Sequence, residues 1–250
     1  MSVIESTIML RRDFKHSVRN SGTLFAALFF PVIMLLMFVY VFGGAFSAGG
    51  TYLNYVVPGI LVLTMGYSTS QTAVTVATDV TQGVMNRFRT MAISRGSVLT
   101  GQLLGSVLRT IVSTVAVLLV ALLMGFEPHA GLGGWLGALG MSVLLVVGMT
   151  WVGVAFGLWV KSPSGAAFAA FPLVFLPYIS SAFAPPTTMP GPMRAFADVQ
   201  PMTPVIESIR GLMTGTPVGD HVLAAVIWWV VIGVAAYLWA RRLFGRDPVR

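Results

Sequence analysis

The chain has 250 residues, of which 56% are hydrophobic and 9% are charged, and its mean hydropathy is +0.85. Because soluble domains carry about 25% charged residues, this composition excludes an ordinary soluble globular domain. The net charge of +7 does not indicate nucleic-acid binding, because the basic residues flank the apolar segments in small groups, where anionic lipid heads attract them. The absence of cysteine excludes disulfides and thiolate metal sites.

Long stretches without a charged residue divide the chain, and a helix needs only about 20 apolar residues to cross a bilayer. They predict an all-α integral membrane protein, a single domain over 1–250, with spans at 24–42, 55–78, 98–125, 134–160, 165–183 and 221–240. In this arrangement twelve of the fifteen Lys and Arg residues lie on one side, where anionic lipid heads attract them. The positive-inside rule therefore predicts that both termini are cytoplasmic.

The segment before the first span predicts an amphipathic helix on the inner membrane surface over 1–22. Leu10, Phe14 and Val18 follow i, i+4 spacing, although Arg11 interrupts this face, and a frayed basic tail is the alternative. A cleaved signal peptide is disfavoured, because the basic segment is long and the apolar run is near span length. Pro31 is expected to kink the span, and 43–50 to form a turn-rich outer loop.

The second span carries a polar stripe, and the loop after it an apolar one. Polar side chains recur at helical spacing at Thr64, Ser68, Gln71 and Thr75. They fit either helix–helix hydrogen bonding or a cavity wall. In the cytoplasmic loop 79–97, one face of a short helix is formed by Val80, Val84, Phe88 and Met91. This helix could lie on the lipid surface or dock on a protein partner.

Small and aromatic residues mark the next three spans. Gly101 with Gly105, and Gly153 with Gly157, are spaced for close helix packing. The fifth span has an aromatic stripe, interrupted by two prolines, that fits either lipid-facing and core residues or a substrate wall; it comprises Phe168, Phe171, Phe175 and Tyr178.

Six prolines between 184 and 204 forbid one long helix over 184–220. Thr203 and Pro204 read as the N-cap and first position of a short helix that Gly215 can end. Its apolar face would comprise Val205, Ile206, Ile209, Leu212 and Met213. Because this helix is too short to span, we expect a re-entrant or interfacial helix at the outer surface.

Several kinds of chemistry are missing from the sequence. Neither Lys15 nor Lys161 stands in a G-x-x-x-x-G-K phosphate loop, so the chain is not expected to bind ATP in this way. The acidic and histidine residues fall at span ends or in loops, which disfavours a coupled carrier and an intramembrane metalloprotease. Arg109 is the one charge inside a span; it could snorkel to the inner surface or pair with a polar group near a cavity.

The segment from Asp79 to Gly96 resembles the signature of type-2 ABC exporter permeases, in the branch typified by the daunorubicin-resistance permease. The residues that match are Asp79, Gly83, Arg87, Phe88, Arg89, Ile93, Ser94 and Arg95. Ala92 replaces the usual proline, and Gln102 stands where the family often has arginine. A second, weaker similarity comprises Gln200, Pro201, Pro204 and Arg210, with Gln200 in place of the usual asparagine.

The resemblance implies the type-2 ABC exporter fold and a half-exporter. Two permease subunits, identical or related, would surround a central cavity above two ATP-binding subunits that hold ATP and Mg. Contacts to the ATP-binding subunit would come from the N-terminal helix and from Asp79, Gly83, Val84, Arg87, Phe88, Arg89, Met91 and Arg95. Spans 2 and 5 would line the substrate route, which gives a role to Thr64, Ser68, Gln71, Thr75, Phe168, Phe171, Phe175 and Tyr178.

The function expected from this resemblance is that of a permease subunit exporting a hydrophobic or amphiphilic molecule, such as a drug, a polyketide-like compound or a lipid. The membrane would be a bacterial cell membrane, and the chain itself would carry no catalytic residue, cofactor or metal. Two alternatives stay open: an ATP-independent channel or secondary carrier, and a structural or signalling membrane protein without transport activity.

Overall fold

The computed structural model describes residues 21–46, 51–83 and 95–245. Within these ranges the chain forms helices, turns and loops and contains no strand, so the predicted all-α class is confirmed. The predicted N-terminal helix over 1–22 falls almost entirely outside the described residues, as does most of the apolar stripe of the loop 79–97.

Long helices alternate with short ones along the chain. In order they are α2 (Ser21–Leu36), the π-helical η1 (Met37–Phe42), α3 (Gly43–Phe46), α4 (Thr51–Thr81), α6 (Arg95–Leu123), α7 (Leu132–Val160), α8 (Pro163–Phe175), the 3-10 helices η2 (Leu176–Ile179) and η3 (Pro186–Thr188), α9 (Gly191–Val199), α10 (Met202–Thr214) and α11 (His221–Gly245).

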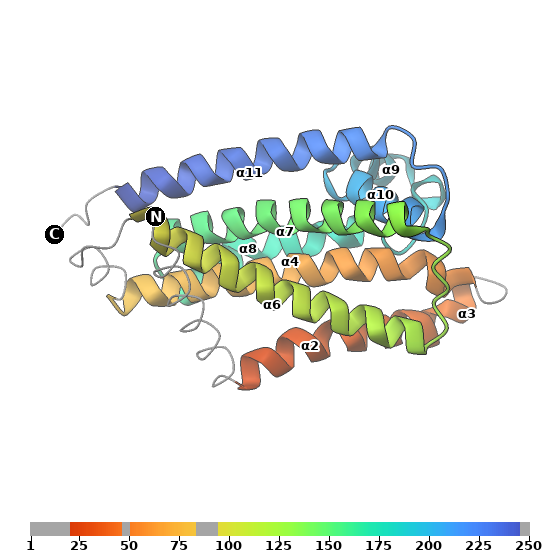
Figure 1. The fold of residues 1–250 in the computed structure, drawn as a ribbon, viewed down its shortest axis with the longest axis horizontal. Helices are drawn as coiled ribbons and strands as arrows, with labels where there is room; N and C mark the ends of the chain where they lie inside the picture. The colour runs from red at the N-terminus through yellow and green to blue at the C-terminus, as the bar shows by residue number, and fades with distance from the viewer. Residues whose placement is uncertain (1–20, 47–50, 84–94, 246–250) are drawn as a thin grey trace.

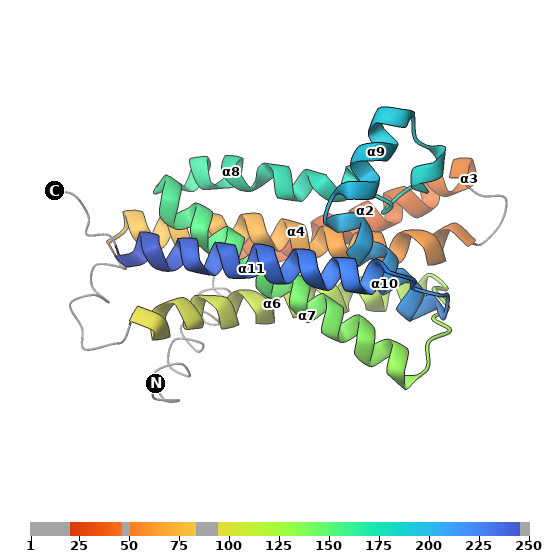
Figure 2. The same ribbon diagram turned by 90° about the horizontal axis from the view of Figure 1, so that it is seen from above.

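The long helices form an elongated bundle with the short helices gathered at one end (Figure 1). We call this end, which holds α9 and α10, the α10 end. α4 lies between its neighbours, with α8 on one side and α6 on the other (Figure 2). α2 begins, and α4, α7 and α11 end, at the opposite end of the bundle.

Basic residues sort between the two ends. The exposed Lys161, Arg241 and Arg242 lie at the end opposite α10, whereas Arg194 and Arg210 lie at the α10 end on α9 and α10. This is the separation that the positive-inside argument requires, with the α10 end outside. The orientation itself stays a prediction.

Each of the six predicted spans coincides with a helix, but the helices differ in how well they suit a membrane. Among the described residues, three helices are long and apolar enough to cross one: Leu103–Leu123, Leu132–Val160 and His221–Gly245. Phe29–Phe42 and Pro163–Ile179 are apolar but shorter. α4 has 31 residues, and its hydroxyl and amide side chains lower its hydropathy. Six membrane crossings therefore stay a prediction.

Three sequence predictions of local structure are wrong in detail. Gly43–Phe46 is helical and continues the first helix, so the first half of the expected outer loop 43–50 is not a loop, and 47–50 lie outside the described residues. The fifth helix changes from α to 3-10 geometry at Leu176 and ends at Ile179, because Pro177 cannot donate a backbone hydrogen bond. α10 begins at Met202 with Pro201 as N-cap, two residues before the predicted start, and no side chain caps it.

Other local predictions hold. Gly215 ends α10 with φ of 75°, a conformation that glycine adopts without steric cost. The predicted apolar face of α10 is buried, apart from the half-buried Leu212. Gly153 and Gly157 let α7 approach the backbone of α4: a Cβ on them would lie 2.7 Å from the carbonyl oxygen of Thr69 and 2.6 Å from that of Ala73, respectively.

Candidate functional site

The polar stripe of α4 divides into a buried and a half-open part. Thr64 and Ser68 are buried, and the Thr64 hydroxyl donates to the Ile60 carbonyl oxygen at 2.7 Å. Gln71 and Thr75 are half-buried, and the Thr75 hydroxyl donates to the Gln71 carbonyl oxygen at 2.9 Å. Both hydroxyls thus bond within their own helix. Only the part of the stripe farther from the α10 end has side chains that a ligand could reach.

Gln71 lies on the side of α4 that faces α2. Its side-chain amide donates to the Tyr67 hydroxyl oxygen at 3.2 Å, and the Tyr67 ring stacks on Phe30 of α2 with centroids 4.9 Å apart. The amide is therefore held in place by an aromatic pair joining the first two long helices.

α8 has one small face and one aromatic face. Ala166 and Ala170 are fully buried against Ala73 and Ala77 of α4. The aromatic side chains project from the bundle, with exposed fractions of 81% for Phe168, 53% for Phe171 and 44% for Phe175. Tyr178, on the following 3-10 helix, is half-buried. The alanines fix which way the aromatic stripe points, because they let α8 lie flat on α4.

The stripe continues as a row of rings that reaches the first helix. Successive centroids are 4.2 Å apart for Phe171 and Phe175, 5.5 Å for Phe175 and Tyr178, and 5.3 Å for Tyr178 and Phe183. Phe183 then stacks on Phe38 of η1 at 4.0 Å. We call these five residues the aromatic row. Sequence reasoning missed Phe38 and Phe183, since nothing local relates two positions so far apart.

The structure does not bring the two predicted stripes together in one pocket of the single chain. Gln71 points toward α2, whereas Phe168 and Phe171 lie on the face of α8 opposite its contact with α4. A cavity that includes both would have to be closed by another surface.

The predicted coupling residues flank a loop at the end opposite α10. Asp79 is half-buried near the end of α4, and Gly83 follows with φ of 70°, a left-handed conformation that favours glycine. Arg95 is the first residue of α6. The remaining ones lie outside the described residues: Val84, Arg87, Phe88, Arg89 and Met91.

Arg109 contacts a small polar cluster between α6 and α4. Its guanidinium donates to the Ser106 hydroxyl oxygen at 3.2 Å, and the Thr72 hydroxyl of α4 also bonds that oxygen at 3.0 Å. Of the two alternatives for this cation, the structure thus shows pairing with a polar group. Because Ser106 is one turn nearer the end opposite α10, the side chain also points the way that snorkelling requires.

Arg210 is the buried cation of the α10 end, and sequence reasoning gave it no site role beyond the family resemblance. It is 8% exposed and ion-pairs with Glu207. Its Nε donates to the Tyr55 carbonyl oxygen at 3.1 Å and Nη2 to the Ser181 carbonyl oxygen at 2.7 Å. The guanidinium carbon lies 3.8 Å from the Tyr55 ring centroid, a cation–π contact. We call these four residues the Arg210 clamp.

Neighbouring contacts attach the rest of this segment. The Gln200 amide donates to the carbonyl oxygens of Leu176 and Ile179 at 3.3 and 3.2 Å. Trp229 of α11 donates from its indole nitrogen to the Pro201 carbonyl oxygen at 3.2 Å. Three residues of the second motif thus tie the α10 segment to its neighbours: Arg210 to α4, Gln200 to η2, and the Pro201 carbonyl oxygen to α11.

An all-helical bundle with basic residues sorted by end and several long apolar helices defines a multi-pass membrane protein. Comparison with protein families is more specific: the family model described as "ABC-2 type transporter" matches residues 5–214. The chain belongs to this family, which supplies the membrane subunit of ABC transporters and not the ATPase.

Comparison with individual proteins supports the same family assignment. The chain is 39% identical over 193 residues to the daunorubicin resistance ABC transporter permease protein DrrB1 of Streptomyces coeruleorubidus, covering 74% of this chain and 66% of that relative, just under two thirds of its length. It is 26% identical to a protein of Porphyra purpurea described as a transport permease, ycf38, over 85% of this chain and 75% of the relative. A third relative, from Mycobacterium tuberculosis, is described as a doxorubicin resistance ABC transporter permease, DrrC. The chain is 20% identical to it, over 90% of this chain and 83% of that relative.

Proposed function

We propose that this chain is the permease subunit of an ATP-driven exporter that moves a hydrophobic or amphiphilic molecule out across a bacterial cell membrane. The observation that carries the proposal is the aromatic row, which is largely exposed on α8 and extends to η1 of the first helix. The relatives named for daunorubicin and doxorubicin resistance support a flat, amphiphilic cargo.

Stacked rings suit such a cargo. Phe171 and Phe175 can pack against an apolar ring system, and contacts of this kind are worth on the order of 1 kcal/mol each. Gln71, held by Tyr67, offers an amide to the polar groups of the cargo. The half-buried polar part of α4 and the exposed face of α8 would form one passage only in the assembled transporter.

The proposed assembly has two permease subunits, identical or related, and two ATP-binding subunits. The exposed apolar face formed by α8 and by Phe29, Ile33 and Leu36 of α2 suits contact with a second permease. The loop from Asp79 to Arg95, at the end with Lys161 and Arg241, would meet the ATP-binding subunits that hold ATP and Mg.

Cysteine labelling of the assembled transporter tests the passage, because the chain has no native cysteine. Single cysteines at Phe171, Phe175 and Gln71 should react with a small maleimide and be protected by cargo. The buried Ser68 and Thr64 should react little and serve as controls. Labelling that cargo never protects at any of these positions would place the passage elsewhere.

Transport itself separates the proposal from its two alternatives. Vesicles containing the permease and its ATP-binding subunit should accumulate a fluorescent anthracycline only when ATP is supplied. Movement down a gradient by the permease alone would indicate a channel or secondary carrier. The absence of movement for every hydrophobic cargo tried, with ATP hydrolysis intact, would indicate a protein without a transport role.

A second prediction concerns the chemistry of the row. Phe171→Ala and Phe175→Ala should each change the preference between a flat aromatic and an aliphatic cargo by roughly fivefold, about 1 kcal/mol, without abolishing export. Phe196→Ala is the matched control, since Phe196 is similarly exposed, at 47%, but lies on α9 and outside the proposed passage. An equal loss for all cargoes would mean that the rings only hold helices together.

A further inference from the structure

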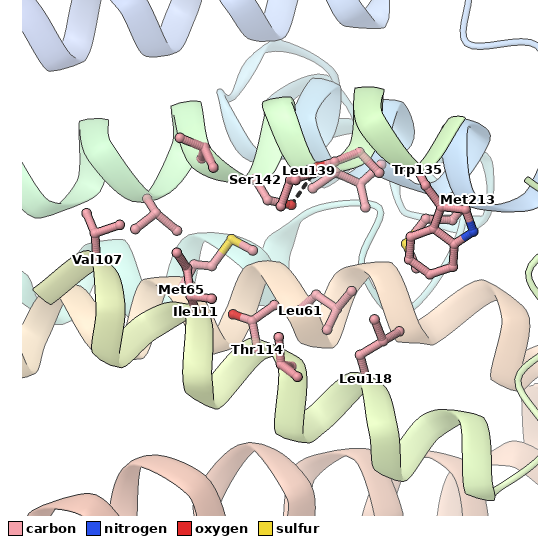
Figure 3. Close-up of a pocket in the computed structure, with 15 residues that line it drawn as sticks. Leu61, Met65, Val107, Ile111, Thr114, Leu118, Trp135, Leu139, Ser142 and Met213 are labelled. Carbon is pink, nitrogen blue, oxygen red and sulfur yellow. Dashed lines mark hydrogen bonds between the residues drawn. The ribbon is translucent and has the colours of Figure 1, made fainter. Parts of the chain in front are cut away.

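A cavity lies on the side of α4 that faces α6 (Figure 3), whereas α8, which carries the aromatic stripe, lies on the other side of α4 (Figure 2). It is lined by α4, α6, α7 and α10, is open on one side, and has a volume of about 120 Å³. Leu61 and Met65 of α4 form its floor, Ile111 and Leu118 of α6 one wall, and Leu139 of α7 the other. Met213 of α10 lies at the same end of the cavity as Trp135 of α7.

The helix arrangement explains why space is left here. The ends of α6 and α7 at the α10 end lie well apart, joined by residues 124–131 (Figures 1 and 2). α10 fills only part of the wedge between them, through Ile209 and Met213.

The mouth of the cavity opens on the outer surface of the bundle. Its rim is apolar on both helices, with exposed fractions of 38% and 47% for Ile111 and Val115 of α6, and 57% and 39% for Leu139 and Val143 of α7. α6 and α7 are two of the helices long and apolar enough to cross a membrane. In a bilayer, the rim therefore faces hydrocarbon chains and not water.

Size and polarity restrict the occupant. Pockets for drug-sized molecules have about 300–1,000 Å³, so this cavity is too small for such a molecule. It is close to apolar cavities of about 150 Å³, which stay dry and take up small apolar molecules. Water needs two to four polar partners, and the lining offers few: the Ser142 hydroxyl already donates to the Ala138 carbonyl oxygen at 2.7 Å.

We propose that this cavity binds the end of one acyl chain of a membrane phospholipid, inserted between α6 and α7 from the surrounding leaflet. A chain already in the bilayer enters without leaving water, so its insertion needs no desolvation of polar groups. It restores the dispersion contacts that the walls of an empty void lack. Because Ile209 and Met213 line the same space, the chain would also pack against α10.

One feature of the lining favours a polar ligand over an acyl chain, and it therefore supplies the sharpest test of the proposal. The Thr114 hydroxyl oxygen is buried and has no hydrogen-bond partner. Figure 3 shows this side chain between α6 and α4. An acyl chain has no group that can form a hydrogen bond with that hydroxyl, whereas a ligand with a carbonyl or hydroxyl group would form one.

Photocrosslinking of the full chain in vesicles tests the site. The vesicles are phosphatidylethanolamine and phosphatidylglycerol with a small fraction of phosphatidylcholine carrying a diazirine at the end of one acyl chain. Adducts mapped by mass spectrometry should concentrate on Met65, Ile111 and Met213. Ala138→Phe fills the cavity and should lower these adducts roughly fivefold or more, because a packed interior leaves no room for a second group.

Ala235→Phe, on the exposed face of α11, is the matched control and should leave the adducts unchanged. Ser142→Phe fills the same space from a half-buried position and replaces Ala138→Phe if that variant does not fold. Adducts spread evenly over α6, α7 and α11, or equally strong in the filled variants, would mean that lipid only coats the surface and would overturn the proposal.

Thr114→Val decides between the two kinds of occupant. It keeps the shape of the side chain and removes the hydroxyl, so labelling by the acyl probe should persist or increase. A clear loss of cavity adducts in this variant, with the control unchanged, would show that the occupant depends on a hydrogen bond and would overturn the assignment to an acyl chain.

Discussion

At the residue scale, the Arg210 clamp is the strongest single feature of the α10 end. One guanidinium satisfies carbonyl oxygens of α4 and of the segment after η2, and it is itself neutralised by Glu207. Hydrogen bonds to a charged group contribute about 1.5–3 kcal/mol each, and a buried acceptor left without its donor is costly. The position of α10 therefore depends on this side chain more than on its weak N-terminal cap.

Arg210→Ala should lower the free energy of unfolding by about 2–4 kcal/mol, since the buried Ser181 and the half-buried Tyr55 carbonyl oxygens lose the guanidinium donor. The apparent Tm in detergent should fall by several degrees. Arg194→Ala is the control: Arg194 and Asp198 are 3.7 Å apart with side chains 53% exposed, and such surface pairs contribute little. A Tm of Arg210→Ala equal to that of Arg194→Ala would show that the clamp does not hold α10.

At the element scale, α7 lies against α4 because small residues let the two backbones meet. A Cβ on Gly157 would lie 2.6 Å from the Ala73 carbonyl oxygen and 2.7 Å from the Val76 Cβ. Backbone cannot move aside as a flexible side chain can, so the crossing of these two helices is fixed by the absence of a single methyl group.

Gly157→Ala should therefore destabilise the protein by about 1–3 kcal/mol through overpacking. Gly140→Ala lies in the same helix, where an added Cβ meets nothing within 4 Å, and it should be neutral or stabilise by about 0.5–1 kcal/mol through helix propensity. Thermal unfolding of both variants, measured side by side, checks that the two substitutions change the stability in opposite directions. Equal Tm values would rule out close backbone contact as the reason for glycine at 157.

The loop between α4 and α6 carries the proposed contact with the ATP-binding subunit, and its apolar stripe stays a prediction from sequence. Phe88→Ala should weaken binding of that subunit by roughly 30-fold, about 2 kcal/mol, because aromatic anchors dominate interfaces. Affinity measured with purified subunits checks this value. Normal co-purification and transport by Phe88→Asp would show that the loop is not the coupling element.

At the scale of the whole molecule, the chain belongs to a family of membrane transporter subunits, and the proposed function assigns the energy source to a partner. The sequence of 250 residues contains no G-x-x-x-x-G-K phosphate loop. The bundle has surfaces that suit cargo, a second permease and lipid. Energy would enter through the end of the bundle that carries the α4–α6 loop and the basic residues.

The purified chain should accordingly release no phosphate from ATP above background, because it lacks the loop that cradles the phosphates. Adding the ATP-binding subunit to the same preparation should produce turnover, which serves as the positive control. Phosphate release that stays with the isolated chain through further purification would contradict the division of roles between subunits.

The sequence by itself determined where the helices are and which faces they bury. Charge-free stretches are long, so they predict helices within a few residues, and spacing along one helix identifies its apolar face, as on α10. Helical spacing also identified the aromatic stripe of α8 and the closely packed glycines of α7 from the sequence. Helix ends at Met202 and Ile179 were misplaced, because proline and local geometry decide them within one turn.

Only the tertiary structure decided which face meets which neighbour. Arg210 and Tyr55 are 155 positions apart, and Phe38 meets Phe183 across four intervening long helices in the sequence. Periodicity reports that a face is polar or apolar, but it carries no information about the helix that covers it. For this reason the division of the α4 stripe, the Arg210 clamp and the cavity between α6 and α7 emerged only when the helices were packed together.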